Sequence, residues 1–158
     1  MSQLGSIDRY LTEIGLTRRD LELVAPRADL LERHVGIAAR RFYARLEKTE
    51  IGSHIAPDEV PELLASRIAH WRRLIGGDFE RLADDHVEHF GRRRVEAGLP
   101  TRASLLAAEG FATEFARFVA ETPEIPEEAR ADLAIVLTKL AFLDLVLACA
   151  AHEISYLD

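Results

Sequence analysis

Apolar side chains recur at helical spacing along almost the whole chain, and this periodicity is what most limits its possible folds. Between residues 27 and 48, five apolar residues follow one another at steps of three or four: Leu31, Val35, Ala38, Phe42 and Leu46. Such steps place them on one face of a helix. Similar stripes recur in residues 61–75, 79–90, 101–119 and 126–156. Since no segment alternates apolar and polar residues as a strand would, the pattern predicts an all-α fold.

Local signals also predict where helices begin and end. Thr17 and Asp20 form the Thr-x-x-Asp pattern of a capping box, in which each residue satisfies a backbone N–H group of the other. The helix that this box opens should end near Pro26. A shorter helix is expected before it, between Ser6 and Gly15.

Size and charge narrow the class of protein. A length of 158 residues predicts a single domain spanning 1–158. The net charge of −7 argues against a partner bound through phosphates, so no nucleic-acid partner is expected. Lys139 and Asp144 interrupt the most apolar segment, and the N-terminus has no leader-like pattern. These features predict a cytoplasmic protein without membrane insertion, and the single cysteine, Cys149, excludes an internal disulfide.

The last predicted helix is apolar on two faces. One face is bulky (Leu133, Leu137, Leu140, Leu147 and Ile154) and the other is smaller (Ala134, Thr138, Ala141, Leu145 and Ala148). A helix that is apolar nearly all round is buried on both sides. In so small a domain this predicts a homodimer formed through the last helices. Complete burial within the monomer is the alternative.

Five segments carry a family resemblance, in order along the chain. They are IGLTRRDLELV (14–24), RRFYARL (40–46), HWRRLIGGDFE (70–80), FGRRRVEAGLP (90–100) and KLAFLDLVLACAAHEISYL (139–157). Together they resemble the globin domain of bacterial globin-coupled sensors and protoglobins. The resemblance implies a globin-like sensor domain with an extra N-terminal helix, followed in full-length sensors by an output module of chemoreceptor, cyclase or kinase type.

The resemblance also assigns two positions of the haem site. Tyr43 matches the distal tyrosine, which in haem-bearing members can donate a hydrogen bond to bound gas. Arg94 matches the proximal histidine, since the family's Ile-Gly-x-x-His-x-x-Ile-Gly-Leu stands here as residues 90–99. Arginine stays protonated and has no lone pair to offer iron. Because some members keep the fold without haem, we expect a haem-free, non-catalytic sensory or regulatory domain for signal transduction.

The alternative is a sensor of oxygen or another diatomic gas that holds haem b through a relocated ligand. On a helix beginning at Asp78, His86 falls on the apolar face and His89 at its edge. Tyr43 would then contact the gas, and Trp71, with His70, would wall the pocket. Trp71 as a plain core residue and Tyr43 as a residue flanking the core remain the simpler readings.

Other chemistry has less support in the sequence. Asp84, Asp85, His86 and His89 contain metal-ligating types, but adjacent helical positions point in different directions, so no metal site is expected. Residues 92–94 form an arginine cluster that could bind an anion, although such a run is more typical of a solvated surface. His34, His54 and His152 are interpreted as surface or structural residues. No nucleophile elbow or phosphate loop occurs, so no enzyme activity is predicted.

Overall fold

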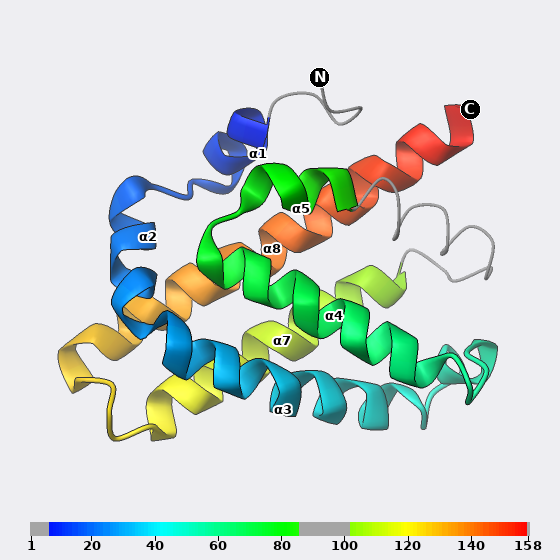
Figure 1. The fold of residues 1–158 in the computed structure, drawn as a ribbon, viewed down its shortest axis with the longest axis horizontal. Helices are drawn as coiled ribbons and strands as arrows, with labels where there is room; N and C mark the ends of the chain where they lie inside the picture. The colour runs from blue at the N-terminus through cyan, green and yellow to red at the C-terminus, as the bar shows by residue number, and fades with distance from the viewer. Residues whose placement is uncertain (1–6, 86–101, 158) are drawn as a thin grey trace.

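Helices joined by turns make up the structure, a computed structural model that describes residues 7–85 and 102–157 (Figure 1). The helices are α1 (Ile7–Ile14), α2 (Arg18–Val24), α3 (Ala28–Leu46), α4 (Val60–Gly76), α5 (Phe79–Asp85), α7 (Arg102–Glu121) and α8 (Glu127–Leu157), with 3-10 turns at Ala25–Arg27 and Gly52–His54. Residues 7–85 and 102–157 contain no strand. The prediction of an all-α fold is confirmed.

The capping box forms as the sequence predicts. The backbone N–H of Asp20 donates to Thr17 Oγ1 at 3.2 Å, and the backbone N–H of Thr17 donates to Asp20 Oδ2 at 2.9 Å. The helix ends at Val24 and a 3-10 turn containing Pro26 leads into α3. At the end of α4, Gly77 takes a left-handed conformation with φ of 75°, which a residue with a Cβ atom adopts only with strain.

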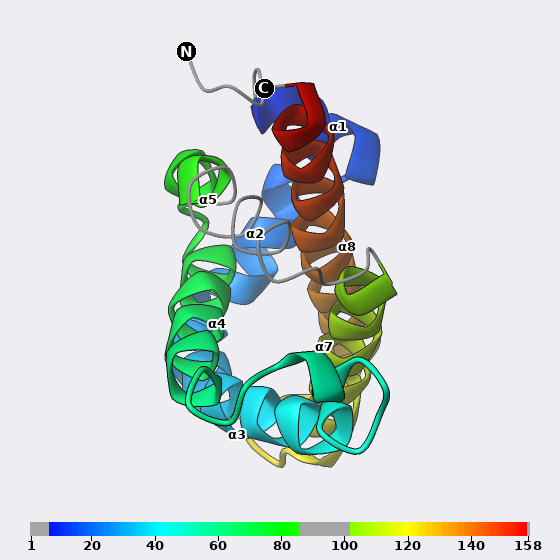
Figure 2. The same cartoon turned by 90° about the vertical axis from the view of Figure 1, so that its right-hand side faces the viewer.

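Four helices, α3, α4, α7 and α8, surround the core. α7 packs along α8, while α3 packs against both α4 and α7 (Figure 2). The two N-terminal helices, α1 and α2, pack on α8, with α1 towards its C-terminal half. Lys139 of α8 links this helix to the turn between α1 and α2. Its Nζ donates hydrogen bonds to the carbonyl oxygen of Gly15 at 2.8 Å and to Asp20 Oδ2 at 2.9 Å.

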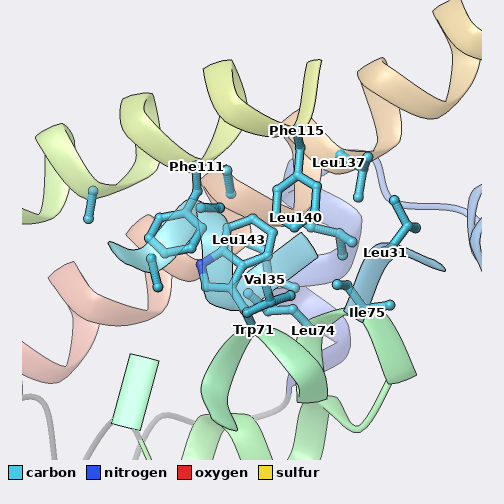
Figure 3. Packing of buried hydrophobic residues seen from close by; sticks show 14 of the residues in the cluster. Leu31, Val35, Trp71, Leu74, Ile75, Phe111, Phe115, Leu137, Leu140 and Leu143 are labelled. Atoms are coloured by element: carbon cyan, nitrogen blue, oxygen red, sulfur yellow. The ribbon is translucent and has the colours of Figure 1, made fainter. Parts of the chain in front are cut away.

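Aromatic rings from α4 and α7 form the centre of the core. The Trp71 ring lies almost parallel to that of Phe111, with centroids 4.8 Å apart and planes at 9°, and it also stacks on Phe115 at 5.1 Å (Figure 3). All three side chains are 1% exposed or less. Aliphatic side chains of α3, α4 and α8 surround them, among them Leu31, Val35, Leu74, Ile75, Leu137, Leu140 and Leu143. Trp71 therefore lies in the core, as the simpler of its two interpretations predicts.

The two apolar faces of α8 are both covered within one chain. On the bulky face, Leu133, Leu137, Leu140 and Leu147 are fully buried. On the smaller face, Ala141, Leu145 and Ala148 are buried, while Ala134 and Thr138 are half-buried. Neighbouring helices of the same chain thus cover much of both faces, and the homodimer through the last helices stays a prediction. Among the side chains of α8 that the structure describes, the large apolar ones that are exposed are Ile135 and Phe142, on a third side of the helix.

By length and composition alone, the stretch Glu127–Ala150 of α8 is apolar enough to cross a membrane. More than half of the stretch is buried inside the domain, as in the core helix of a soluble protein, so this is weak evidence for a span. Beyond its first turns, two charged residues interrupt this stretch, and both are paired, Lys139 with Asp20 and Asp144 with residues of α4.

Candidate functional site

Three ionisable side chains meet in the interior between α4 and α8. Asp144 of α8 accepts a hydrogen bond from Arg67 Nη1 through Oδ2 at 3.0 Å, and its Oδ1 lies 2.5 Å from His70 Nε2. Arg67 and His70 are three residues apart on α4, so one carboxylate contacts two side chains on the same face of the helix. None of the three side chains is more than 5% exposed. We refer to Arg67, His70 and Asp144 as the ionic cluster.

Electrostatics hold Arg67 in its charged form. Burial by itself lowers the pKa of the guanidinium, but Asp144 and the Tyr43 hydroxyl outweigh burial and raise that pKa above its ordinary value. A buried charge is tolerated when it is paired and hydrogen-bonded. Removing one partner of such a pair costs about 3–5 kcal/mol, because the other charge is left unpaired. The ionic cluster is therefore a fixed link between α4 and α8.

Tyr43 is the fourth polar group at this position. It lies half-buried on α3, with its ring edge-on to Phe42 at a centroid distance of 5.3 Å. Its hydroxyl is a hydrogen-bonding partner of Arg67 and raises the pKa of the guanidinium. Tyr43 therefore flanks the core, as the simpler interpretation has it, and its hydroxyl also interacts with Arg67. The residue that the resemblance assigns to the gas-binding side of haem instead contacts a buried arginine.

The proposed site residues are only partly covered by the structure. Tyr43 and Trp71 are described, whereas His86, His89 and Arg94 lie outside the described residues. The structure places Tyr43 beside the ionic cluster, and His70 belongs to that cluster. Trp71, the residue after His70, points into the aromatic core instead. Its indole N–H is buried without a hydrogen-bond partner among the described residues.

Sequence reasoning missed two of the three members of the ionic cluster. The sequence marks Asp144 only as an interruption in an apolar segment, and no sequence pattern distinguishes Arg67. A signal did exist, because a lone carboxylate in the middle of a buried helix requires a cationic or hydrogen-bonding partner. The sequence could not identify that partner, since Arg67 and Asp144 are 77 residues apart.

None of the histidines whose side chains the structure describes is placed to hold a haem iron beside Tyr43. Haem iron needs an axial donor with a free lone pair. His70 Nε2 contacts Asp144, and His54 is exposed in the loop between α3 and α4. His34 precedes Tyr43 by nine residues, which places the two on opposite sides of α3. The group beside Tyr43 is thus a paired guanidinium, which cannot ligate iron.

A metal site also has no support in the described part of the chain. No group of three or more metal-ligating side chains comes together within residues 7–85 and 102–157. Asp84 is exposed at the end of α5, and the histidines considered with it, His86 and His89, lie outside the described residues.

Comparison with known proteins agrees with this all-helical arrangement. No curated protein matches the chain. One family model does match, that of the protoglobins, and it covers residues 4–157. The match takes in the segments that carry the resemblance and all the described helices. The chain therefore belongs to the protoglobin family.

Proposed function

We propose that this protein is a haem-free, non-catalytic sensory or regulatory domain of the protoglobin family. The observation that carries the proposal is the buried pair of Arg67 and Asp144 beside Tyr43. In a haem-binding relative, the tyrosine hydroxyl would be available to bound gas. Here the Tyr43 hydroxyl interacts with the guanidinium of Arg67, which the Asp144 carboxylate holds.

The sequence supports the same proposal independently. Arg94 stands where the family has its proximal histidine, and arginine has no lone pair for iron. Members of the protoglobin family usually bind haem. The proposal therefore describes a departure from the usual chemistry of the family, at both the distal and the proximal position.

The signal would pass through α8, the longest described helix. α8 contacts α1, α2, α4 and α7, so a change in any of these helices can act on it directly. It also exposes Ile135 and Phe142, which in a homodimer would contact a second copy. We propose a cytoplasmic homodimer that transmits a stimulus through its last helices to an output module of chemoreceptor, cyclase or kinase type. Such transmission requires two packings of α8 whose balance the stimulus shifts.

An absorption spectrum tests the haem-free proposal. The protein is produced with ample haem, passed through gel filtration, and measured before and after reduction and addition of carbon monoxide. We expect a well-folded helical protein without a Soret band. A stoichiometric Soret band would contradict the proposal and favour a haem b gas sensor. His86→Ala and His89→Ala would then identify the relocated ligand by loss of the band.

A further inference from the structure

The two N-terminal helices and the corner that joins them form a unit, residues 7–24, which we call the N-terminal arm. We infer that this arm opens from α8 as one body while the core stays folded, and that Lys139 holds it in the closed position. The inference deepens the proposed function, and it rests on that proposal in taking α8 as the route of the signal. It supplies an element with two positions against α8, docked and released.

The first argument is that the corner between α1 and α2 is completed by bonds within the arm. At the end of α1 the backbone N–H of Leu16 donates to the carbonyl oxygen of Leu11 at 2.9 Å, and that of Gly15 donates to the carbonyl oxygen of Thr12 at 3.0 Å. These bonds form a Schellman motif, in which Gly15 takes the left-handed conformation with φ of 70°. The capping box of α2 follows directly at Thr17. Because one motif leads into the other, the two helices are held at a defined angle, and they dock and leave together.

The second argument is that the arm buries little of its surface. None of the eight residues of α1 is fully buried. In α2 the buried residue is Val24, at the end that joins the core. The other large apolar side chains of the arm pack against the core but are only partly buried: Ile7, Tyr10, Leu11, Ile14, Leu16, Leu21 and Leu23. A segment with few buried apolar contacts opens at a lower free energy than the core to which it is attached.

The third argument is the position of Lys139, whose Nζ contacts both sides of the corner. It donates to the carbonyl oxygen of Gly15 at 2.8 Å, next to α1, and to Asp20 Oδ2 at 2.9 Å, on α2. Burial by itself raises the pKa of Asp20, but the hydrogen bonds from Lys139 and Thr17 outweigh burial and lower that pKa below its ordinary value. The carboxylate therefore stays charged at neutral pH and keeps its pairing with the ammonium group.

This ion pair can also be broken without a large cost. The side chains of Lys139 and Asp20 are 28% and 18% exposed, whereas those of the ionic cluster are 5% exposed or less. Charges that water can reach are solvated as soon as they separate, so such a pair contributes much less than a pair closed to solvent. Lys139 thus favours the docked position of the arm and still allows release.

Release of the arm would uncover part of α8. α1 packs on α8, towards its C-terminal half, and also contacts α5 (Figure 1). Its departure would remove the cover from the helix through which the signal would pass. A ligand or partner that binds one of the two positions of the arm more tightly than the other would shift the balance between them.

Hydrogen exchange followed by mass spectrometry measures this opening. Helices of eight and seven residues are not stable alone in water, so a released arm loses its helical bonds and its amides exchange. The natural protein is compared with Lys139→Met, which removes the contact from the α8 side. Asp20→Asn removes the charge from the arm side and keeps an acceptor for the backbone N–H of Thr17. Arg41→Met is the matched control, because it removes an ion pair between α3 and α7 instead.

We expect the amides of the arm in the natural protein to exchange at least about tenfold faster than those of α3 and α7, after correction for sequence effects. Lys139→Met should raise the exchange of α1 and α2 by the same factor, about three- to tenfold, and leave α3 and α7 unchanged. Asp20→Asn should act in the same direction and decides the question if Lys139→Met does not fold. Arg41→Met should leave the arm at its natural rate. Helix content and the thermal unfolding midpoint establish that each variant is folded.

Equal exchange of arm and core in the natural protein would overturn the inference, because the arm would then open only when the whole protein unfolds. A rise in Lys139→Met that is confined to one of the two helices would show that they do not move as one body. Unchanged exchange in Lys139→Met, or an equal rise in Arg41→Met, would exclude Lys139 as the residue that holds the arm. The absorption spectrum tests the haem-free function separately: a Soret band would overturn that function, whereas faster exchange of the arm would still support its opening.

Discussion

At the scale of single residues, His34 has an unusual environment for a histidine. Its ring stacks on Phe118 with centroids 4.0 Å apart and lies edge-on to Phe115 at 5.6 Å. The side chain is buried, and Nε2 has no hydrogen-bond partner among the described residues. Burial lowers the pKa of His34, and Arg41 lowers it further, although Glu114 opposes both. The folded protein therefore favours the neutral imidazole.

This environment predicts a loss of stability on acidification. The unfolded chain takes up the proton near the ordinary histidine pKa of about 6.5, whereas the folded protein resists it to lower pH. Below that pH the free energy of unfolding should fall, by at most about 1.4 kcal/mol per pH unit from this one group. His34→Phe should reduce the fall, and it should raise stability at neutral pH by about 1 kcal/mol, because an unsatisfied buried nitrogen is removed.

Urea unfolding at pH 7.5 and pH 5.5 measures both effects. Between pH 8 and pH 7.5 His34 is neutral in both states, so the natural protein and His34→Phe should respond alike there, and this range is the internal control. An equal loss of stability between pH 7.5 and pH 5.5 in the two proteins would show that His34 does not contribute.

At the scale of helices and turns, sequence patterns that span only a few residues correctly predicted where helices begin and which of their faces are buried. The capping box of Thr17 and Asp20 and the stripe from Leu31 to Leu46 both appear where the sequence places them. Interactions across the fold were not predictable in this way. Hydrophobic spacing identified the apolar faces of α8, but which helices cover each face depends on how the chain folds as a whole.

Two glycines in and after α3 lead to opposite predictions. Gly36 lies within α3, and a Cβ atom added there would meet Arg40 at an ordinary contact distance of 3.5 Å. Gly36→Ala should therefore stabilise the protein by about 0.5–1 kcal/mol, because alanine favours the helix. At Gly52 an added Cβ would lie 2.3 Å from the carbonyl oxygen of Leu46. Since backbone must move to relieve this contact, Gly52→Ala should destabilise by about 1–3 kcal/mol.

Chemical denaturation of the two variants provides the comparison, and each serves as the control for the other. Both remove a glycine and add one methyl group, so the entropy of the unfolded chain changes in the same way. If the urea midpoints of both variants shift in the same direction, the close contact at Gly52 does not destabilise the alanine variant, and the prediction is wrong.

At the scale of the whole molecule, the ionic cluster and the exposed side of α8 are two parts of one arrangement. Asp144 follows Phe142 by two residues, about 200° around the helix, so it faces inward while Phe142 faces outward. Ile135 is seven residues before Phe142 and lies on the same side. A rotation of α8 that strained the ionic cluster would also move this outer side. The helix thus joins the interior of the domain to the surface that we propose for dimerisation.

Substitution on the outer side of α8 tests that surface. Phe142 is 49% exposed and Ile135 is 55% exposed in the single chain. If they contact a second copy, a buried aromatic at the interface should contribute about 2 kcal/mol or more to association. Phe142→Glu and Ile135→Glu should therefore shift the protein towards monomer in sedimentation velocity experiments, without loss of helix content. Ile37→Glu is the matched control, because Ile37 is also an exposed apolar residue, at 40%, but lies on α3. It should leave the dimer intact. A natural protein that stays monomeric at high concentration, or dimers unaffected by glutamate at both α8 positions, would exclude this surface.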